Sequence, residues 1–386
     1  MPDASPIKWH LAHTSWFFEA FILCPQRPDY AALHPQYGYL YNSYYEAIGE
    51  RVARPERGLI TRPSLDEVRG YRAHVDRELV RWLADASAAE LAGAAPLIEI
   101  GLHHEQQHQE LMLTDLKHLL SLNPLRPVYQ SALPRGSARR RAPALRWIDF
   151  AGGTEWIGQP EASGFGFDNE GPAHQRLLRP FRLASRLATC AEYLAFMNDG
   201  GYATPSLWLS DGWQAVQQRR WRAPLYWGQR EGEWQQFSLA GMRPIDPDAP
   251  VAHVSFYEAD AFARWSGARL AAEDEWEVAA RSRPIEGNFV ESAALQPLPA
   301  AADESLQQMF GDVWEWTQSA YAPYPGYRPA PGALGEYNGK FMCNQLVLRG
   351  GSCATPLSHV RASYRNFFHP DARWQFVGIR LARDAS

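Results

Sequence analysis

Residues 101–115 read GLHHEQQHQELMLTD, a stretch with the composition of a helix. Helical residues turn by about 100° each, so His104 and His108 lie about 40° apart on one helix face. Imidazoles that share a face in this way can bind one metal ion. A solvated, histidine-rich surface is the alternative for an isolated pair. Because a third candidate, His13, stands on another amphipathic stretch, the pattern predicts a metal site.

The same stretch contains the zinc-protease motif H-E-x-x-H, at residues 104–108. A protease of that kind needs a third ligand soon after the helix, either a glutamate or a histidine that follows a glycine. The first glutamate after Glu110 is Glu155, and Asp115 is the only nearby carboxylate. The third ligand is therefore expected upstream, at His13.

The composition of the whole chain indicates a globular protein of two domains. It has 386 residues, of which 46% are hydrophobic and 21% are charged, enough to bury two ordinary cores. The formal net charge of -5 argues against a general nucleic-acid binder, which needs a basic face. No stretch approaches about twenty apolar residues, and the first residues do not have the pattern of a signal peptide. We therefore expect a cytoplasmic protein that binds neither nucleic acid nor membranes.

The N-terminal third of the chain predicts a small helical bundle. A helix is expected over residues 5–22, with Ser5 as its cap. Ser64 and Glu67 have the spacing of a capping box, which opens a helix that runs to about residue 92. A third helix, expected from about 95 to 122, carries the histidine pair. Packed helices with inward-facing metal ligands are typical of such bundles.

The sequence pattern changes after this region. Residues 126–145 are rich in Pro and Arg and predict a linker. Beyond them, short apolar runs alternate with Gly, Pro and Asp, and two helices are clear, at 190–199 and 256–266. The predicted organisation is a bundle over residues 1–125, this linker, and an irregular α+β domain over residues 146–386.

Two groups of motifs follow one another along the chain. The first group reads WHLAHTSWFFE (9–19), NSYYEAIGERVARPERG (42–58) and HHEQQHQE (103–110). The second includes GDVWEWTQSAY (311–321), NGKFMCNQLVLRGGSCATP (338–356) and RASYRNFFHPDARWQFVGIRLAR (361–383). Together they resemble the iron-dependent sulfoxide synthases of ergothioneine biosynthesis. The resemblance implies a DinB-like metal-binding bundle followed by a formylglycine-generating-enzyme-type domain, an α+β fold with C-type-lectin-like features.

The resemblance implies that His13, His104 and His108 bind one Fe(II). Three imidazoles on one face of the ion leave positions open for substrates and O₂. His10 competes for the role of third ligand, and His13 is favoured because it stands in the family's L-A-H position. His103 points about 100° away from His104 and is expected to be a surface or capping residue.

The resemblance also implies the reaction. In this family, iron holds hercynine, the trimethylated betaine of histidine, together with the thiolate of cysteine or γ-glutamylcysteine. O₂ then drives formation of a bond between sulfur and the imidazole C2 carbon, and the product is a sulfoxide. Sister enzymes that use a selenium donor, or that act on histidine as ovothiol-type synthases do, are the nearest alternatives. A metal-stabilised binding module without turnover is an alternative of another class.

Further site residues are implied by the same resemblance. Gln107 and Asn366 are expected to contact hercynine, and Asn366 is equally typical of a turn. The proton donor is expected to be Tyr324, in the run YAPYPGY, with Tyr321 and Tyr327 as alternatives. The remaining substrate-binding candidates are Tyr44, Tyr45, Phe367 and Phe368, and core packing is the more frequent explanation for adjacent tyrosines such as Tyr44 and Tyr45.

Arg54 and Arg57 occupy the region in which relatives hold the carboxylates of the thiol substrate. A guanidinium group suits that task because it can pair with a carboxylate through two parallel hydrogen bonds. The alternative is that both arginines are solvated on the ARPERG loop, where Pro55 and Glu56 mark a turn.

The chain departs from the family pattern in two places. Met1 falls just before the first motif, where relatives usually have a further helix, and Ala271 and Ala272 replace a common Pro-Thr pair. Formylglycine generators bind copper with two cysteines, and Cys343 and Cys353 lie near that region, but the histidine set favours a separate iron site. Four scattered cysteines are too few for a disulfide framework.

Overall fold

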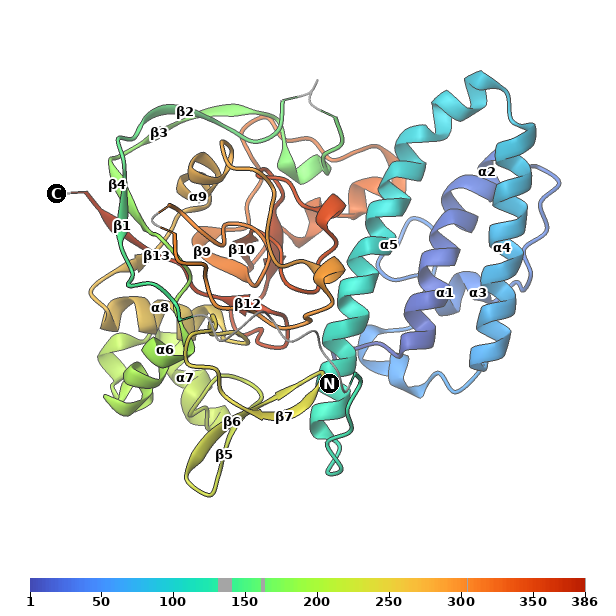
Figure 1. The fold of residues 1–386 in the computed structure, drawn as a ribbon. Helices are drawn as coiled ribbons and strands as arrows, with labels where there is room; N and C mark the ends of the chain where they lie inside the picture. Colours follow the sequence, from blue (N-terminus) through green and yellow to red (C-terminus); the bar gives the residue numbers. More distant parts are fainter. Residues whose placement is uncertain (131–140, 161–163, 304, 386) are drawn as a thin grey trace. The chain divides into compact units, whose positions relative to one another are not determined.

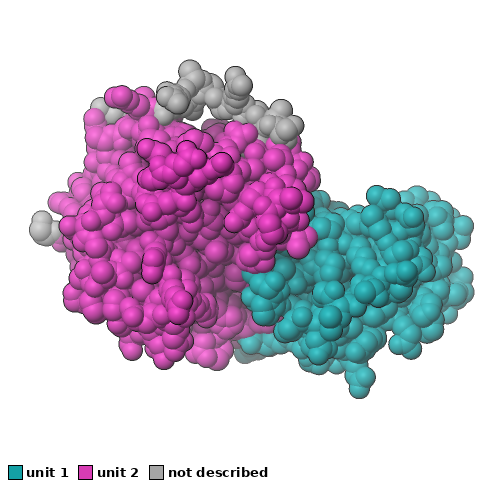
Figure 2. Space-filling model, turned by 90° about the horizontal axis from the view of Figure 1, so that it is seen from below, with its two compact units in different colours: residues 1–116, 328–340 teal, residues 117–327, 341–386 magenta. Residues whose placement is uncertain are grey.

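The structure is a computed structural model that describes residues 1–130, 141–160, 164–303 and 305–385. It forms two compact units, which Figure 2 shows in different colours. The first unit comprises Met1–Leu116 and Arg328–Lys340, and the second comprises Lys117–Tyr327 and Phe341–Ser386. The first unit is helical, whereas the second combines sheets with short helices (Figure 1), which confirms the predicted fold class. The domain boundaries proposed at 125 and 146 stay predictions, because residues 131–140 of the expected linker lie outside the described residues.

The first unit is a bundle in which α1 packs against α4 (Figure 1). Its elements are α1 (Ile7–Phe18), the π-helix η1 (Glu19–Leu23), α2 (Cys24–Gln26), α3 (Tyr37–Tyr41), the 3-10 helix η2 (Arg54–Leu59), α4 (Leu65–Asp85) and α5 (Ala88–Leu122). Apolar side chains recur along α4 at helical spacing, and Val68, Tyr71, Val75 and Trp82 are buried. This apolar face is the side of α4 that stabilises the bundle.

The capping box predicted for α4 is confirmed. Ser64 Oγ accepts from the Glu67 N–H at 3.3 Å, and the Glu67 carboxylate accepts from the Ser64 N–H at 2.7 Å. The predicted break between this helix and the next, near residues 92 to 95, is wrong. The break lies at residues 86 and 87 instead, because Ser87 and Glu90 form a second reciprocal cap with bonds of 2.8 Å and 3.3 Å. Pro96 therefore lies inside α5.

The first predicted helix forms, but the cap proposed for it is wrong. Pro6 occupies the N-cap position of α1, where no side chain caps the helix. The N–H of Ser5 donates instead to Asp115 Oδ2, 3.0 Å away on α5. The start of α1 is thus tied to another helix and not to a local cap.

Within the described residues, the second unit contains two four-stranded sheets. One is antiparallel, in the order β1 (Trp147–Phe150), β4 (Phe181–Ala184), β13 (Leu381–Asp384) and β8 (Arg269–Leu270). The other has the order β11 (Asn366–Phe368), β10 (Leu346–Arg349), β9 (Trp314–Ala320) and β12 (Val377–Gly378). In the second sheet β12 runs parallel to β9, and the other pairs are antiparallel.

Smaller sheets and short helices complete the second unit. The strands are β2 (Gly153–Ile157) and β3 (His174–Leu178), and then β5 (Trp227–Arg230), β6 (Glu233–Ser238) and β7 (Gly241–Pro244). The helices are α6 (Cys190–Asn198), α7 (Ser210–Arg219), α8 (Phe256–Trp265) and α9 (Glu273–Ala280). The helices predicted at 190–199 and 256–266 are confirmed as α6 and α8, each with a capping box. The sequence analysis missed α7 (ten residues) and α9 (eight residues). The residues at their N-caps, Leu209 and Ala272, have no side chain that caps a helix, whereas α6 and α8 begin with Thr189 and Ser255.

None of the helices in the described parts of the chain combines the length and the apolar character that crossing a membrane requires.

Lys117, in the second unit, is a buried amine. Its Nζ lies 2.7 Å from His253 Nε2 and 4.6 Å from the centroid of the Phe376 ring. Burial lowers the pKa of Lys117 from 10.5 to about 7. Because the pKa is lower in the folded state, the unfolded chain binds the proton more tightly. Lys117 therefore destabilises the folded protein at neutral pH, and this penalty decreases as the pH rises from 7 towards 10.5.

We expect the substitution Lys117→Met to raise the free energy of unfolding at pH 7, because methionine fills similar space without a charge. The gain should shrink by about 1.4 kcal/mol for each pH unit between roughly pH 7 and pH 9. Denaturant unfolding of both proteins at these two pH values measures the difference. An equal gain at both would contradict the lowered pKa of the amine.

Candidate metal centre

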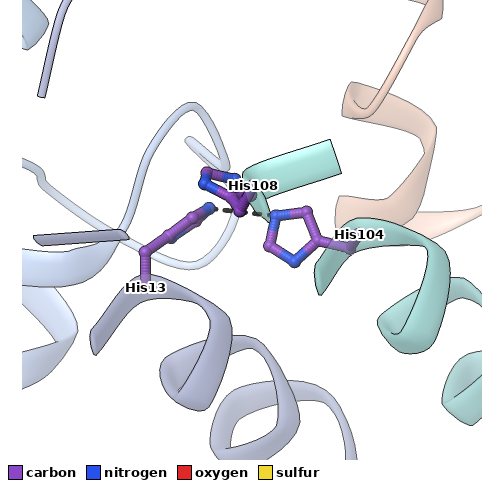
Figure 3. Close-up of side chains that lie close together, drawn as sticks. All are labelled: His13, His104 and His108. Atoms are coloured by element: carbon purple, nitrogen blue, oxygen red, sulfur yellow. Dashed lines mark hydrogen bonds between the residues drawn. The ribbon is translucent and has the colours of Figure 1, made fainter. Parts of the chain in front are cut away.

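Three histidines from two helices converge inside the first unit (Figure 3). His13 lies on α1, and His104 and His108 lie one turn apart on α5. The Nε2 atoms of His13 and His104 are 3.1 Å apart, and one ring nitrogen from each residue lies within 4.8 Å of the others. Among the described residues, this is the one group of three or more potential metal-ligating side chains. The structure thus brings together the residues that sequence spacing and resemblance singled out.

The three rings are held in the neutral form that binds metals. All are buried, with exposed fractions of 0%, 1% and 7% for His13, His104 and His108. Burial lowers the pKa of His104 to about 3 and lowers the pKa of both His13 and His108 well below the usual value. A neutral imidazole offers a lone pair to a metal ion, whereas an imidazolium does not. Three converging lone pairs without a carboxylate fit a divalent transition-metal ion.

The orientation of His13 is set by its surroundings. Its Nδ1 lies 2.6 Å from the backbone oxygen of Tyr41, so Nδ1 carries the proton and Nε2 is the free lone pair. The ring stacks on Trp9 with 4.6 Å between centroids and 15° between planes. His13 therefore presents Nε2 to His104 in a fixed orientation.

His10, the competing third ligand, is not a member of the group. Its Nδ1 lies 2.8 Å from His108 Nδ1, and its Nε2 lies 3.2 Å from Asp115 Oδ2. Both ring nitrogens thus face partners other than His13 and His104. His10 contacts a candidate ligand and does not replace one.

A segment distant in sequence belongs to the same unit. Residues 328–340, which we call the strap, leave the second unit and join the bundle. Tyr337 of the strap is buried, its hydroxyl donates to Gln107 Oε1, and its ring centroid lies 6.0 Å from that of His104. The sequence analysis missed Tyr337. Its only signal was its position directly before the NGKF motif, since a short irregular segment has no periodicity.

Charged side chains of the strap bind it to other residues of the bundle. The two Glu336 carboxylate oxygens accept from the N–H groups of Ala47, at 2.8 Å, and of Glu46, at 3.0 Å. Lys340 Nζ lies 2.8 Å from Glu336 and also donates to the backbone oxygen of Tyr44. These contacts on both sides of Tyr337 fix the position of its phenol.

The tyrosines expected from the YAPYPGY run lie in the second unit. The Tyr324 hydroxyl accepts from Arg349 at 2.9 Å and donates to Glu273 at 3.3 Å, and burial raises the pKa of this phenol. The Tyr321 hydroxyl accepts from Asn169 at 2.8 Å, and the Tyr327 hydroxyl donates to Asp168 at 2.9 Å. All three phenols have partners within their own unit.

The two predicted arginines differ in environment. Arg54 is exposed and donates from Nε to the backbone oxygen of Asp3 at 2.9 Å. Arg57 is 2% exposed, and its Cζ lies 3.7 Å from the centroid of the Trp9 ring. It donates to Ser5 Oγ at 3.2 Å and to Ser43 Oγ at 3.0 Å, and burial lowers its pKa to about 9. Arg57 is therefore a buried cation whose hydrogen bonds go to uncharged groups.

The other expected substrate contacts lie on both units. Asn366, Phe367 and Phe368 form the strand β11, so Asn366 does not lie in a turn, although its Oδ1 accepts from the neighbouring Phe367 N–H at 2.9 Å. Tyr45 is buried, and its ring centroid lies 4.6 Å from that of Tyr44. The chain's cysteines are all free thiols: Cys24 and Cys343 are exposed, and Cys190 and Cys353 are buried.

Comparison with known proteins agrees with the two units. Residues 1–112 match the DinB superfamily, and residues 131–305 and 298–385 match the sulfatase-modifying factor enzyme 1-like domain. The hercynine oxygenase of Mycolicibacterium smegmatis is 32% identical over 417 residues, which cover 99% of this chain and 92% of that protein. The chain belongs to the hercynine oxygenase family. It is accordingly an oxygenase, which confirms the enzyme class expected from the motifs.

Two further relatives show how much of this chain each kind of protein matches. The hercynine oxygenase of Mycolicibacterium thermoresistibile is 34% identical over 421 residues, which cover 99% of this chain and 88% of that protein. The formylglycine-generating enzyme of Streptomyces coelicolor is 27% identical over 316 residues, which cover 67% of this chain and 96% of that enzyme. The hercynine oxygenase family thus shares both units with this chain, whereas the formylglycine-generating enzyme matches only about two thirds of it.

Proposed function

We propose that this oxygenase is an Fe(II)- and O₂-dependent sulfoxide synthase that joins the sulfur of cysteine or γ-glutamylcysteine to the imidazole C2 carbon of hercynine. The observation that carries the proposal is the group of three neutral, buried histidines with a phenol at 6.0 Å between ring centroids. The thiol and the imidazole C–H each lose one hydrogen, and O₂ supplies the sulfoxide oxygen and the oxygen of one water. Bound iron supplies the redox chemistry that couples these changes.

The residues of the first unit would bind, orient and protonate. His13, His104 and His108 would hold the ion on one face and leave other positions for substrates. Gln107 would orient hercynine from α5, and its bond to Tyr337 would place the phenol beside the reacting groups. We propose Tyr337, in place of Tyr324, as the proton donor, because Tyr337 lies in the same unit as the histidines. Asn366, Phe367, Phe368, Tyr44 and Tyr45 remain proposed substrate contacts.

Reconstitution with defined substrates tests the reaction. Protein loaded anaerobically with Fe(II) would receive hercynine, one donor and then air, and mass spectrometry would identify the product. Parallel reactions with cysteine, γ-glutamylcysteine and a selenium donor, and with histidine in place of hercynine, separate the alternatives. Absence of a C–S product from every pair, with iron bound, would favour a binding module. The proposal includes a cytoplasmic location, which the four free thiols support.

A separate prediction concerns the two arginines and the KM for the thiol donor. We expect Arg57→Ala to raise the KM for the thiol donor, because a buried guanidinium bonded only to neutral groups is suited to a substrate carboxylate. The loss should be about 1.5–3 kcal/mol, and the KM for hercynine should hardly change. Arg54→Ala is the comparison: Arg54 is exposed, so a smaller effect is expected.

Titration of the donor against both variants, with hercynine saturating, decides between the two roles. If Arg57→Ala lowers the thermal stability and leaves the donor KM unchanged, the guanidinium serves only to join Ser5 and Ser43, and the donor carboxylate binds elsewhere.

A further inference from the structure

A continuous chain of hydrogen bonds joins a buried carboxylate to one of the three histidines. Asp115 Oδ2 lies 3.2 Å from His10 Nε2, and His10 Nδ1 lies 2.8 Å from His108 Nδ1. Asp115 and His10 are 4% and 2% exposed, so water does not compete for these bonds. The chain links α1 to α5 inside one compact unit.

The carboxylate determines the direction of every bond in this chain. An ionised carboxylate can only accept, so His10 Nε2 carries the proton. A neutral His10 then has a lone pair on Nδ1, and His108 Nδ1 must donate to it. His108 Nε2 is left as the lone pair. The reverse arrangement, in which His108 Nδ1 accepts, would put a proton on the nitrogen that has to face the metal.

Specific hydrogen bonds fix the position of Asp115. Its Oδ2 also accepts from the Ser5 N–H at 3.0 Å, which holds the carboxylate at the start of α1. Within the described residues, His10 is the one side chain that is hydrogen-bonded to its Oδ2, and Asp115 Oδ1 has no hydrogen-bond partner there. The buried guanidinium of Arg57, which also donates to Ser5 Oγ, is a positive charge that interacts electrostatically with this carboxylate. A buried anion favours positive charge nearby, and a bound metal ion would supply more of it. The histidine group has no carboxylate of its own, and Asp115 is joined to it through two imidazoles.

We propose that Asp115 and His10 are positioning residues of the metal centre, which act through His108 by fixing its tautomer and increasing its basicity as a ligand. This inference rests on the proposed metal site. It assigns to Asp115, a buried carboxylate that reaches His108 through His10 by hydrogen bonds, a part in balancing the charge of the ion from outside the coordination sphere.

Metal binding by the metal-free protein tests the inference without turnover. Co(II) would be titrated anaerobically into the wild-type protein and variants in competition with a chelating dye, and the visible d–d bands would be recorded. Asp115→Asn keeps an oxygen that can accept from His10 and Ser5 but removes the charge. We expect it to weaken Co(II) binding by about 10- to 100-fold and to shift the d–d bands.

Two more variants separate positioning from stability. His10→Leu should weaken Co(II) binding at least as much as Asp115→Asn, and His10→Gln should restore part of the affinity, because an amide oxygen can accept from His108 Nδ1. Glu19→Gln is the matched control. Glu19 is a buried carboxylate of the same unit, which accepts from the Tyr30 and Tyr71 hydroxyls at 2.6 Å and 2.5 Å and does not contact the histidines.

The outcomes distinguish the inference from the function on which it rests. Wild-type protein that binds no Co(II) would remove the metal centre and the inference with it. One-to-one binding by the wild type, with unchanged affinity and spectrum in folded Asp115→Asn and His10→Leu proteins, would overturn the inference alone. Equal weakening by Glu19→Gln would also overturn it, because loss of any buried carboxylate would then suffice.

Discussion

The His104→Ala protein is expected to lose bound metal and oxygenase activity together. Its Nε2 lies 3.1 Å from His13 Nε2 at the centre of the group, and alanine leaves only two imidazoles. Two ligands do not hold a divalent ion against solvent at ordinary concentrations, so metal content should fall from about one ion per chain to nearly none. Metal analysis after anaerobic loading, together with product formation, measures both effects.

His103→Ala is the matched control for this experiment. His103 precedes His104 on α5 but is not a member of the histidine group, so its replacement should leave the metal content near that of the wild type. Equal metal in the His104→Ala and wild-type proteins would refute the site. If the His13→Ala protein retained metal while the His104→Ala protein lost it, His10 would replace His13 as the third ligand, because His10 Nδ1 lies 2.8 Å from His108 Nδ1.

The Tyr337→Phe protein is expected to make a different product. The ring remains, so the packing against His104 and Tyr44 should persist, but the phenol proton and the bond to Gln107 are lost. A positioned acid contributes about 10²–10⁴-fold to a rate. Sulfoxide formation should therefore fall by about 100-fold or more, and dioxygenation of the thiol to a sulfinic acid, which uses both oxygen atoms, should take its place.

Tyr324→Phe supplies the comparison. The Tyr324 phenol joins Arg349 and Glu273 within the second unit, so its loss should lower stability and leave the ratio of sulfoxide to sulfinic acid unchanged. Product ratios from both variants, measured at equal iron content, test the assignment. A changed ratio in Tyr324→Phe and an unchanged one in Tyr337→Phe would restore Tyr324 as the proton donor.

Local patterns predicted the parts of the site that lie close in sequence. His104 and His108 share a helix face because helical geometry places residues four apart on one side. The reciprocal cap of Ser64 and Glu67 likewise depends on a spacing of three residues. His13 needed the additional family motif, because periodicity on α1 does not distinguish it from His10.

Element boundaries were less predictable. A reciprocal cap at Ser87 and Glu90 starts α5 well before Pro96. The start of α1 depends on the Ser5 N–H reaching Asp115, 110 residues away. The first of these bonds joins residues three apart, so the spacing of Ser87 and Glu90 already contained the signal for it. The second is visible only after the helices have packed, because its partner is distant in sequence.

The sequence by itself determined the helical bundle, the α+β region and the histidine pair, because helical and strand periods are set by bonds between near neighbours. Only the tertiary structure brought Tyr337 to Gln107, across 230 residues of sequence, and Asp115 to His10, across 105. Such contacts depend on which surfaces pack together and where an irregular segment returns to the bundle. No local spacing encodes that choice, because the free energy that fixes it comes from burial and hydrogen bonds shared among distant segments.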